Sequence, residues 1–424
     1  MEGTGVGASV IRKDALYKVT GKAIFAADIK RPGMLHAKVL RSKVPHAMVE
    51  AIDTRQAAAY PGVVKVLTAN DIPGTNNNGI IVKDEPVLVK DKICRIGDAI
   101  ALVAAESEKA AAEAVNLIEV KLKELPPVFD PLEAMQPGAP LVHASNILCL
   151  QKIRKGDIEA GFAAADIIVE NVYRTQQVAH SFIEPEAGVA EYNGTDITLW
   201  VSTQNAHYDR GEVARTMNMD ASRVRIIQTV TGGGFGGKLD ISVQCYIALL
   251  AYYTGRPVKL VYDREESMIC SSKRHPYYME YKTGATKNGK LTALKAKIVG
   301  DTGAYASYGP GVLTRAAVHA TGPYEVPNVW VDAYGVYTNN PMAGAMRGFG
   351  VPQVAFAHES QMNLLAEKLG ITPLEIRLRN ALVRGSLTAT GQLMQDSVGI
   401  IETLKQAVKQ AGILSPAVKQ EGKP

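Results

Sequence analysis

The spacing of hydrophobic and polar residues predicts both strands and helices in the first quarter of the chain. GMLHAKVLRS and GVVKVLTAND are rich in β-branched residues and alternate in polarity, which is typical of strands. ESEKAAAEAVNLI predicts a helix that begins near Glu106 and Glu108, because acidic residues stabilise a helix N-terminus. Residues from about 10 to 125 are therefore expected to form a compact α+β unit.

A proline-rich segment follows this unit. Its five prolines are Pro126, Pro127, Pro131, Pro137 and Pro140. Proline fixes φ and lacks an N–H donor, so regular helix and interior strand are not expected over about fifteen residues. We expect an N-terminal domain over residues 1–125, an interdomain linker over 126–145 and a second domain over 146–424.

The second region begins with strand patterns. They are DIIVENVYRTQ, GVAEYNGTDITLWVSTQ and VRIIQTV, and Asn193-Gly194 inside the second is typical of a hairpin turn. Further along, KRHPYYMEYKTGATKNGKLTALKAKIVGDTGAYASYG predicts consecutive strands joined by turns. Strands that alternate with helices, as in a doubly wound sheet, are not expected here.

Three helices are also expected in this region. DISVQCYIALLAYYTG predicts a buried helix capped by Asp240 and ended by Gly255, and the strand PVKLVYD follows it. QVAFAHESQMNLLAEKLG and GIIETLKQAVKQAG predict amphipathic helices, and LSPAVKQEGKP is expected to be a frayed tail.

Composition narrows the function classes. The 424 residues carry a net charge of +5 with Lys and Arg scattered among acids, so no nucleic-acid partner is expected. The four cysteines show no C-x-x-C spacing, so neither a zinc site nor a thiolate-held iron–sulfur cluster is expected. No apolar run is long enough for a signal sequence or a membrane span, and we expect a cytoplasmic protein.

One glycine-rich stretch, TVTGGGFGGKLD, fits two nucleotide motifs incompletely. Gly232, Gly234 and Gly237 form G-x-G-x-x-G, but the spacing to the acid Asp263 is too long for a Rossmann unit. The same stretch lacks the last residue of a P-loop, because Leu239 cannot bind Mg²⁺. Nucleotide-dependent oxidoreduction is therefore a distant alternative. Backbone N–H groups that bind an anion or polar ligand at a helix N-terminus are favoured over a merely structural turn.

A second stretch, NNPMAGAMRGFGVPQ, repeats the Gly-Phe-Gly unit. Here Arg347 precedes Gly348-Phe349-Gly350, and a guanidinium beside exposed backbone donors suits an oxyanion. A third candidate is Gln204 in WVSTQNAH, a neutral amide at the predicted end of a strand. Together the three features predict one ligand site.

The chain resembles the xanthine dehydrogenase and aldehyde oxidase family of molybdenum hydroxylases. The residues that carry the resemblance are VSTQ (201–204), GGGFGGK (232–238), TRAAVHATGPYEVPN (314–328), AMRGFGVPQ (345–353) and TPLEIRLRNAL (372–382). KVTGKAIFAADI and LRSKVPHA are similar to the family's hammerhead domain. The resemblance implies an α+β fold, with a hammerhead domain followed by the first half of a molybdopterin-binding domain.

The resemblance also implies roles for the loop residues. In the family the sulfurs of a pterin dithiolene hold molybdenum, so no residue of this chain is expected to ligate the metal directly. Gln204 is expected beside an oxo or chalcogenide ligand of the metal, Phe349 against an aromatic substrate, and Arg315 beside the substrate or its developing charge. The implied cofactor-binding residues are Gln204, Gly233, Gly234, Phe235, Gly236, Arg347 and Gly348.

The sequence departs from the family pattern in two places. Leu239 stands where purine-oxidising relatives have a glutamate that binds the purine, which favours a carboxylated heterocycle. The chain ends at Pro424, before the family's GVGE-like motif and its general base, and Glu184 in FIEPEAG is expected to be structural. The resemblance therefore implies a split enzyme, whose partners are a second molybdopterin subunit with the catalytic glutamate, an iron–sulfur subunit and an FAD subunit.

Within the family, the similarity is greatest to split enzymes that hydroxylate nicotinate. It implies conversion of nicotinate to 6-hydroxynicotinate with water as oxygen source, a cytosine dinucleotide form of the pterin and a selenium ligand on the metal. Xanthine or purine dehydrogenation and oxidation of another aromatic compound or an aldehyde are the alternatives. Carbon monoxide oxidation is not favoured, because no cysteine lies near Gln204 or Arg347 in the sequence.

Overall fold

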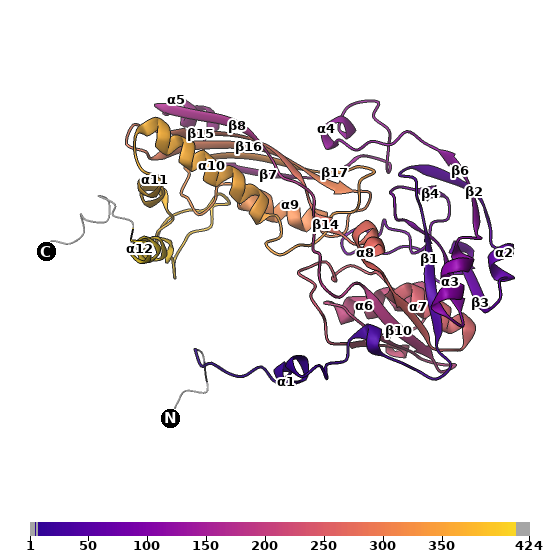
Figure 1. Cartoon of the computed structure of the whole chain (residues 1–424). Helices are drawn as coiled ribbons and strands as arrows, with labels where there is room; N and C mark the ends of the chain where they lie inside the picture. The colour runs from indigo at the N-terminus through magenta and orange to yellow at the C-terminus, as the bar shows by residue number, and fades with distance from the viewer. Residues whose placement is uncertain (1–4, 6, 413–424) are drawn as a thin grey trace.

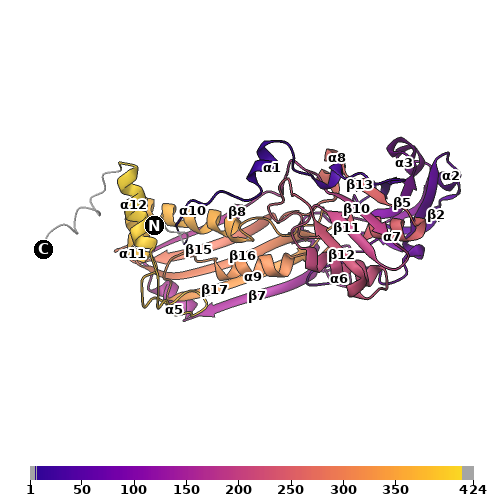
Figure 2. The same ribbon diagram turned by 90° about the horizontal axis from the view of Figure 1, so that it is seen from below.

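The computed structural model describes residue 5 and residues 7–412. Figure 1 shows two joined regions: one surrounds a long sheet with the helices α9 and α10, and the other surrounds a second sheet and carries the N-terminal strands. Seen from below in Figure 2, the molecule is elongated and the two regions lie end to end. The predicted α+β class is confirmed.

A seven-stranded sheet forms the framework of one region. Its strands in spatial order are β12 (Val224–Gln228), β11 (Ile197–Val201), β10 (Ala187–Tyr192), β13 (Val258–Val261), β1 (Leu35–Arg41), β5 (Ala99–Ala105) and β3 (Val63–Thr68). The predicted hairpin turn joins β10 to β11, and the side chain of Asn193 accepts bonds from the amides of Thr195 and Asp196. These segments thus form the strands that their patterns predict.

This sheet crosses the predicted domain boundary. β1 pairs in parallel with β13, with Leu35 opposite Val258, although more than 200 residues separate them. Beside the sheet lie a smaller one, β4 (Lys92–Ile93), β2 (Ala47–Asp53) and β6 (Glu119–Glu124), and the helices α2 (Arg55–Ala58) and α3 (Glu108–Val115). The division at residue 125 remains a prediction, but the two regions share one hydrogen-bonded sheet.

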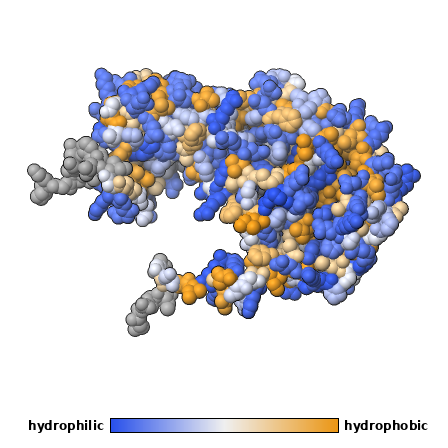
Figure 3. All heavy atoms as spheres, viewed as in Figure 1, coloured by the Kyte–Doolittle hydropathy of each residue, from blue (hydrophilic) through white to orange (hydrophobic). Residues whose placement is uncertain are grey.

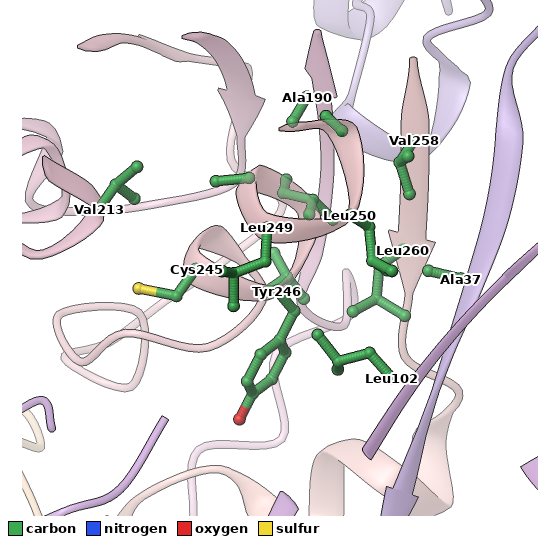
Figure 4. Packing of buried hydrophobic residues seen from close by; sticks show 14 of the residues in the cluster. Ala37, Leu102, Ala190, Val213, Cys245, Tyr246, Leu249, Leu250, Val258 and Leu260 are labelled. Atoms are coloured by element: carbon green, nitrogen blue, oxygen red, sulfur yellow. The ribbon is translucent and has the colours of Figure 1, made fainter. Parts of the chain in front are cut away.

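Helix α7 (Gln244–Thr254) lies in the main core. Residues 244–251 are all buried, and Figure 4 shows Leu249 and Leu250 packed toward Val258 and Leu260 of the sheet. Gly255 ends the helix in the left-handed conformation, as predicted. The predicted cap was wrong: the helix begins after Val243, and Asp240 instead accepts a hydrogen bond from the hydroxyl of Ser307.

The other region is built on a five-stranded sheet. Its order is β7 (Ile147–Lys155), β17 (Asn328–Tyr337), β16 (Leu291–Gly303), β15 (Tyr277–Ala285) and β8 (Ile167–Arg174). Helices α9 (Gly309–Val318) and α10 (Val351–Leu369) contribute buried residues to the core on this sheet. The remaining helices here are α5 (Ile158–Ala163), α11 (Pro373–Asn380) and α12 (Ile400–Gln410). The predicted tail beyond residue 412 lies outside the described residues.

The proline-rich segment contains one helical turn, contrary to expectation. Helix α4 (Pro131–Ala134) starts with proline at its first position, where no N–H bond is lost, and Asp130 caps it. Val128 and Val142 are buried in a cluster with Tyr305 and Tyr337, so the segment packs against the body. The remaining short elements are α1 (Ala15–Val19), η1 (Ala26–Asp28), η2 (Ala69–Asp71), β9 (Val178–Ala179), α6 (Ala206–Thr216), η3 (Ala221–Arg223), α8 (Arg264–Cys270) and β14 (Lys273–Arg274).

The nucleotide-binding alternative finds no support in the topology. In a Rossmann unit the strands before and after the helix are neighbours, whereas β11 and β10 lie between β12 and β13 here. After β13 the chain continues through β14, β15 and β16, as the strand-rich pattern predicts. No helix in the described part of the chain is both long and apolar enough to span a membrane.

Replacing Leu249 by Ala should destabilise the protein by about 2–5 kcal/mol, because a fully buried side chain of the α7 core is lost. The measurement is the free energy of unfolding in denaturant. The control is Val172→Ala on β8, whose side chain is 55% exposed and whose loss should cost less than about 1 kcal/mol. Equal effects of the two changes would contradict the assignment of α7 to the core.

Candidate functional site

The two glycine loops predicted to share a site are in direct contact. The amide of Arg347 donates a hydrogen bond to the carbonyl oxygen of Phe235 at 2.9 Å. A Cβ atom at Gly236 would lie 2.6 Å from the carbonyl oxygen of Ala345, so only glycine permits this approach. Residues more than 100 positions apart therefore form one surface.

Both loops place a phenylalanine in the left-handed region. Phe235 has φ of 53° and Phe349 has φ of 51°, and the neighbours Gly236, Gly348 and Gly350 have φ between 91° and 105°. A bulky residue in this region costs on the order of 1–3 kcal/mol, and such strain gathers at functional sites. The shared backbone shape indicates that the repeated Gly-Phe-Gly unit has the same structural task in both loops.

Gln204 follows β11 and packs over the first loop. Its side-chain Oε1 accepts hydrogen bonds from the amides of Gly236 at 2.9 Å and Lys238 at 3.3 Å. A Cβ atom at Gly234 would lie 2.5 Å from the same oxygen. Because Oε1 faces these two donors, Nε2 must point away from the loop, and among the described residues it donates to none. The exposed amide of Gln204 is thus fixed as a hydrogen-bond donor.

The loops offer further donors, but not at a helix N-terminus as predicted. α7 begins only at Gln244, so its dipole does not act on the first loop. Within the described chain, the amides of Gly233, Gly234 and Phe235 in the first loop make no hydrogen bond. In the second loop the same holds for Gly348, which is exposed. These backbone groups can bind a polar or anionic ligand.

Two side chains that the sequence did not single out support the second loop. Nε2 of His180 donates to the carbonyl oxygen of Ala345 at 2.8 Å, and Arg274 donates to the carbonyl oxygen of Arg347 at 2.8 Å. Burial lowers the pKa of His180, so its ring is neutral at pH 7. Both bonds join side chains to distant backbone atoms, which leaves no pattern in the sequence.

Glu184 and Lys238 form a buried ion pair beneath the first loop. Nζ of Lys238 lies 2.9 Å from Oε2 of Glu184, and the two side chains are 1% and 10% exposed, in the order Lys238 and Glu184. Burial lowers the pKa of Lys238, although the adjacent carboxylate opposes this effect. The expected structural role of Glu184 agrees with this contact.

The predicted substrate residues lie on the side of the second loop. Phe349 contacts Tyr308 edge to face with ring centroids 5.8 Å apart, and a Cβ atom at Gly311 would lie 3.4 Å from its ring. Arg315 lies on α9, which packs against Gly350. The side chain of Arg315 is exposed and makes no hydrogen bond or ion pair within the described residues. It therefore lies on a neighbouring helix, but no contact joins it to either loop.

The loops form an open surface and no enclosed pocket. Behind the first loop, a cavity of about 30 Å³ is lined by Arg41, Glu85, Arg95, Glu186, Gly237 and Asp240, among others. That volume suits one or two water molecules. Burial raises the pKa of Glu85 there to about 7. A larger hollow, of about 360 Å³, lies over the exposed face of the five-stranded sheet, away from the loops. A large ligand must therefore approach from the open side.

Two protein families match the chain. The description "Aldehyde oxidase and xanthine dehydrogenase, a/b hammerhead domain" applies to residues 20–126, and "Molybdopterin cofactor-binding domain" applies to residues 142–381. The chain belongs to the xanthine dehydrogenase and aldehyde oxidase family of molybdenum hydroxylases. A hammerhead domain thus precedes a molybdopterin-binding domain, as the sequence motifs predict.

Individual relatives agree with this assignment. The chain is 53% identical over 408 residues to the nicotinate dehydrogenase large molybdopterin subunit of Eubacterium barkeri, with 96% of each chain covered. It is 44% identical to a probable xanthine dehydrogenase subunit of Bacillus subtilis, covering 88% of this chain and 50% of that protein. The solved aldehyde oxidoreductase from Desulfovibrio gigas matches with a TM-score of 0.90 and 32% identity, covering 94% of this chain and 46% of that one. The chain therefore spans about half the length of the latter two proteins.

The site fits a molybdopterin cofactor. The pterin brings its own sulfur ligands, and the described residues contain no cluster of three or more His, Cys, Asp or Glu that could hold a metal ion. What the loops present is a set of unpaired amides and the fixed amide of Gln204, with the exposed guanidinium of Arg347 beside them. Such donors suit the oxygen-rich, anionic cofactor.

Replacing Gly236 by Ala should separate the two loops, because the added methyl group meets the backbone of Ala345 at a φ of 105°. We expect a loss of at least about 2 kcal/mol in unfolding free energy. Gly255→Ala is the matched control: φ is also positive, at 64°, but nothing lies within 4 Å of the new Cβ. This change should cost only about 1 kcal/mol. A smaller loss in the Gly236 variant than in the control would contradict the close contact of the loops.

Proposed function

We propose that this chain is the molybdenum-cofactor-binding subunit of a multi-subunit hydroxylase that converts nicotinate to 6-hydroxynicotinate. The observation that carries the proposal is the joining of two strained Gly-Phe-Gly loops beneath the fixed amide donor of Gln204. The 53% identity to a chain of matching length, named as a nicotinate dehydrogenase subunit, supports the choice of substrate. The reaction replaces the C6–H bond by C–OH, takes oxygen from water and releases two electrons and two protons.

The proposed roles follow from the positions of the residues. When bound, the molybdenum cofactor supplies the centre that accepts two electrons and delivers the oxygen. The amides of Gly233, Gly234, Phe235 and Gly348 bind the cofactor with Arg347, and Gly236 permits the approach of the two loops. Gln204 donates from Nε2 to an oxygen, sulfur or selenium ligand of the metal, which stabilises charge that develops there.

The substrate is proposed to lie against Phe349. Its ring offers a stacking face, and the edge contact with Tyr308 fixes its orientation. Arg315 on α9 is proposed to steady the carboxylate or the developing charge. A second candidate is a purine such as xanthine, since one relative is named as a probable xanthine dehydrogenase subunit. Leu239 favours nicotinate, because an aliphatic side chain cannot hydrogen bond to a purine ring.

The general base is proposed to come from a second molybdopterin subunit. Of the nearby carboxylates, Glu184 is held by Lys238, and no other acid of the described chain contacts the loops. Relatives of about twice this length support a missing half of the site, as does the word "large" in the name of a similar subunit. Iron–sulfur and FAD subunits are proposed to take the electrons. The pterin is proposed to be the cytosine dinucleotide, with selenium as a metal ligand.

An exposed apolar segment gives this second subunit a place to bind. Phe25 bridges to Val230 beside the first loop, and the chain before it leaves the body, as Figure 3 shows by the hollow between this segment and the five-stranded-sheet region. α1 buries none of its residues. The large apolar side chains on the segment, with their exposed fractions, are Val10 (80%), Ile11 (87%), Leu16 (68%), Val19 (81%) and Ile24 (62%). A short isolated helix is unstable in water, so a covering partner is favoured.

The first experiment tests the function. The purified complex should contain molybdenum, hydroxylate nicotinate at C6 with ¹⁸O from labelled water, and oxidise xanthine at least about tenfold more slowly, since one lost hydrogen bond to a purine costs this much. Metal analysis and mass spectrometry of the product are the measurements. Turnover without molybdenum would refute the function, and faster turnover of xanthine would refute the substrate.

Replacing Gln204 by Glu should lower kcat on the order of 100-fold, which is the usual effect of losing one oriented donor. The carboxylate keeps the two bonds from Gly236 and Lys238 but cannot donate. The melting temperature should therefore stay within a few degrees of the wild type. His207→Ala, an exposed change three residues further on, is the control and should leave kcat unchanged. An unaltered kcat in the Gln204 variant would contradict the proposed donor.

The double change Ile11→Asp and Val19→Asp should leave the unfolding free energy of the isolated chain within about 0.5 kcal/mol of wild type. It should lower the amount of second molybdopterin subunit retained at least tenfold, because charges replace exposed apolar contacts. Co-expression and size-exclusion chromatography measure this retention. Val172→Asp, an equally apolar and exposed position on β8, should retain the partner. Equal loss in both variants would contradict a specific role of the N-terminal segment.

A further inference from the structure

A single carboxylate oxygen collects three hydrogen bonds beneath the first loop. Oε2 of Glu184 accepts from the amide of Gly232 at 2.7 Å, the hydroxyl of Ser202 at 2.6 Å and the ammonium of Lys238 at 2.9 Å. Gly232 and Lys238 stand at the two ends of the loop, and Ser202 lies two residues before Gln204. One atom therefore ties both ends of the loop to the segment that carries the amide donor.

Lys238 completes this connection with all three of its ammonium hydrogens. Besides the carboxylate, Nζ donates to the carbonyl oxygen of Glu184 and to the hydroxyl of Ser202, each at 2.8 Å. It also lies 4.6 Å from the centre of the Phe182 ring. The ammonium has no donor left for a ligand, so its function is to hold the surrounding backbone.

The main chain of Lys238 faces Gln204. Its carbonyl oxygen accepts from the backbone amide of Gln204 at 2.9 Å, and its amide donates to Oε1 of the Gln204 side chain at 3.3 Å. The residue that is clamped by Glu184 through its side chain thus orients Gln204 through its backbone. A shift of this residue would remove one of the two donors that fix which way the Gln204 amide points.

Glu184 has no route to the open side of the site. Oε2 is occupied by three donors, and Oε1 is buried and without a hydrogen-bond partner in the described chain. A general base needs an oxygen within hydrogen-bond reach of the reacting proton. These contacts therefore distinguish a positioning role from direct proton transfer.

We propose that Glu184 and Lys238 are positioning residues, whose buried ion pair clamps the first glycine loop and keeps the amide of Gln204 turned toward the cofactor. The inference rests on the proposed function for its effect on catalysis. The clamp itself is a property of the chain and can be measured without turnover.

Three variants test the clamp in the full chain and in the purified complex. Glu184→Gln keeps the acceptor but removes the charge, Lys238→Met keeps the apolar stem, and the double variant leaves no unpaired charge if the single variants fold poorly. Amide hydrogen exchange of the peptide covering residues 229–240 should accelerate at least tenfold in each single variant. In the complex, kcat for nicotinate should fall at least tenfold while KM changes less than threefold, because substrate contacts are untouched.

The control is Glu359→Gln, which breaks the ion pair of Glu359 with Arg377 between α10 and α11. It should lower the melting temperature but leave exchange in residues 229–240 and kcat unchanged. The clamp is refuted if both single variants keep wild-type exchange in this peptide. It is also refuted if Glu184→Gln abolishes the acidic limb of the kcat/KM profile at unaltered exchange, since Glu184 would then act as a base. Fast exchange in the variants of a complex that lacks molybdenum would refute the proposed function and leave the clamp standing.

Discussion

The approach of two glycine loops to within hydrogen-bonding distance is the constraint on which the site depends. It requires the absence of a side chain at Gly236, since a single methyl group would collide with the backbone of the opposite loop. Around this contact the protein places supports from several elements: Gln204 after β11, His180 beside β9 and Arg274 on β14. Each support binds a backbone atom of a loop, so the shape of the loops is set from outside.

The rigid parts of the molecule offset the strain in the loops. Two phenylalanines with positive φ cost on the order of 1–3 kcal/mol each, and a buried ion pair adds a desolvation cost. The opposing contribution comes from cores such as the one around α7, where eight consecutive residues are buried against the seven-stranded sheet. Local irregularity is thus confined to a surface between two well-packed regions, which suits a site that must present fixed backbone donors.

Much of this architecture could be predicted from local sequence patterns. The alternation in residues 277–303, the Asn193-Gly194 turn and the glycine that ends α7 each act on near neighbours, and each was identified correctly. The two Gly-Phe-Gly units were recognised by their composition, and their proximity was anticipated. The start of α7 was misplaced because Asp240 has a distant partner, Ser307, that competes with the capping role.

The remaining contacts of the site could not be predicted, because they join residues with no common pattern. Glu184 was expected only to be structural, and nothing near it in the sequence indicates that Ser202, Gly232 and Lys238 would converge on one of its oxygens. The bond from His180 to Ala345 spans 165 residues. Such side-chain to backbone bonds follow from the packing of complete sheets, so they become visible only when the tertiary structure is known.

The parallel pairing of β1 with β13 has a consequence for how the polypeptide matures. The N-terminal strands emerge from the ribosome first, yet the edge of β1 stays without its neighbour until about 220 further residues have been synthesised. Such long-range closure is slow and leaves an open, aggregation-prone strand edge during translation. Productive biogenesis therefore depends on shielding this edge until the second half of the sheet arrives.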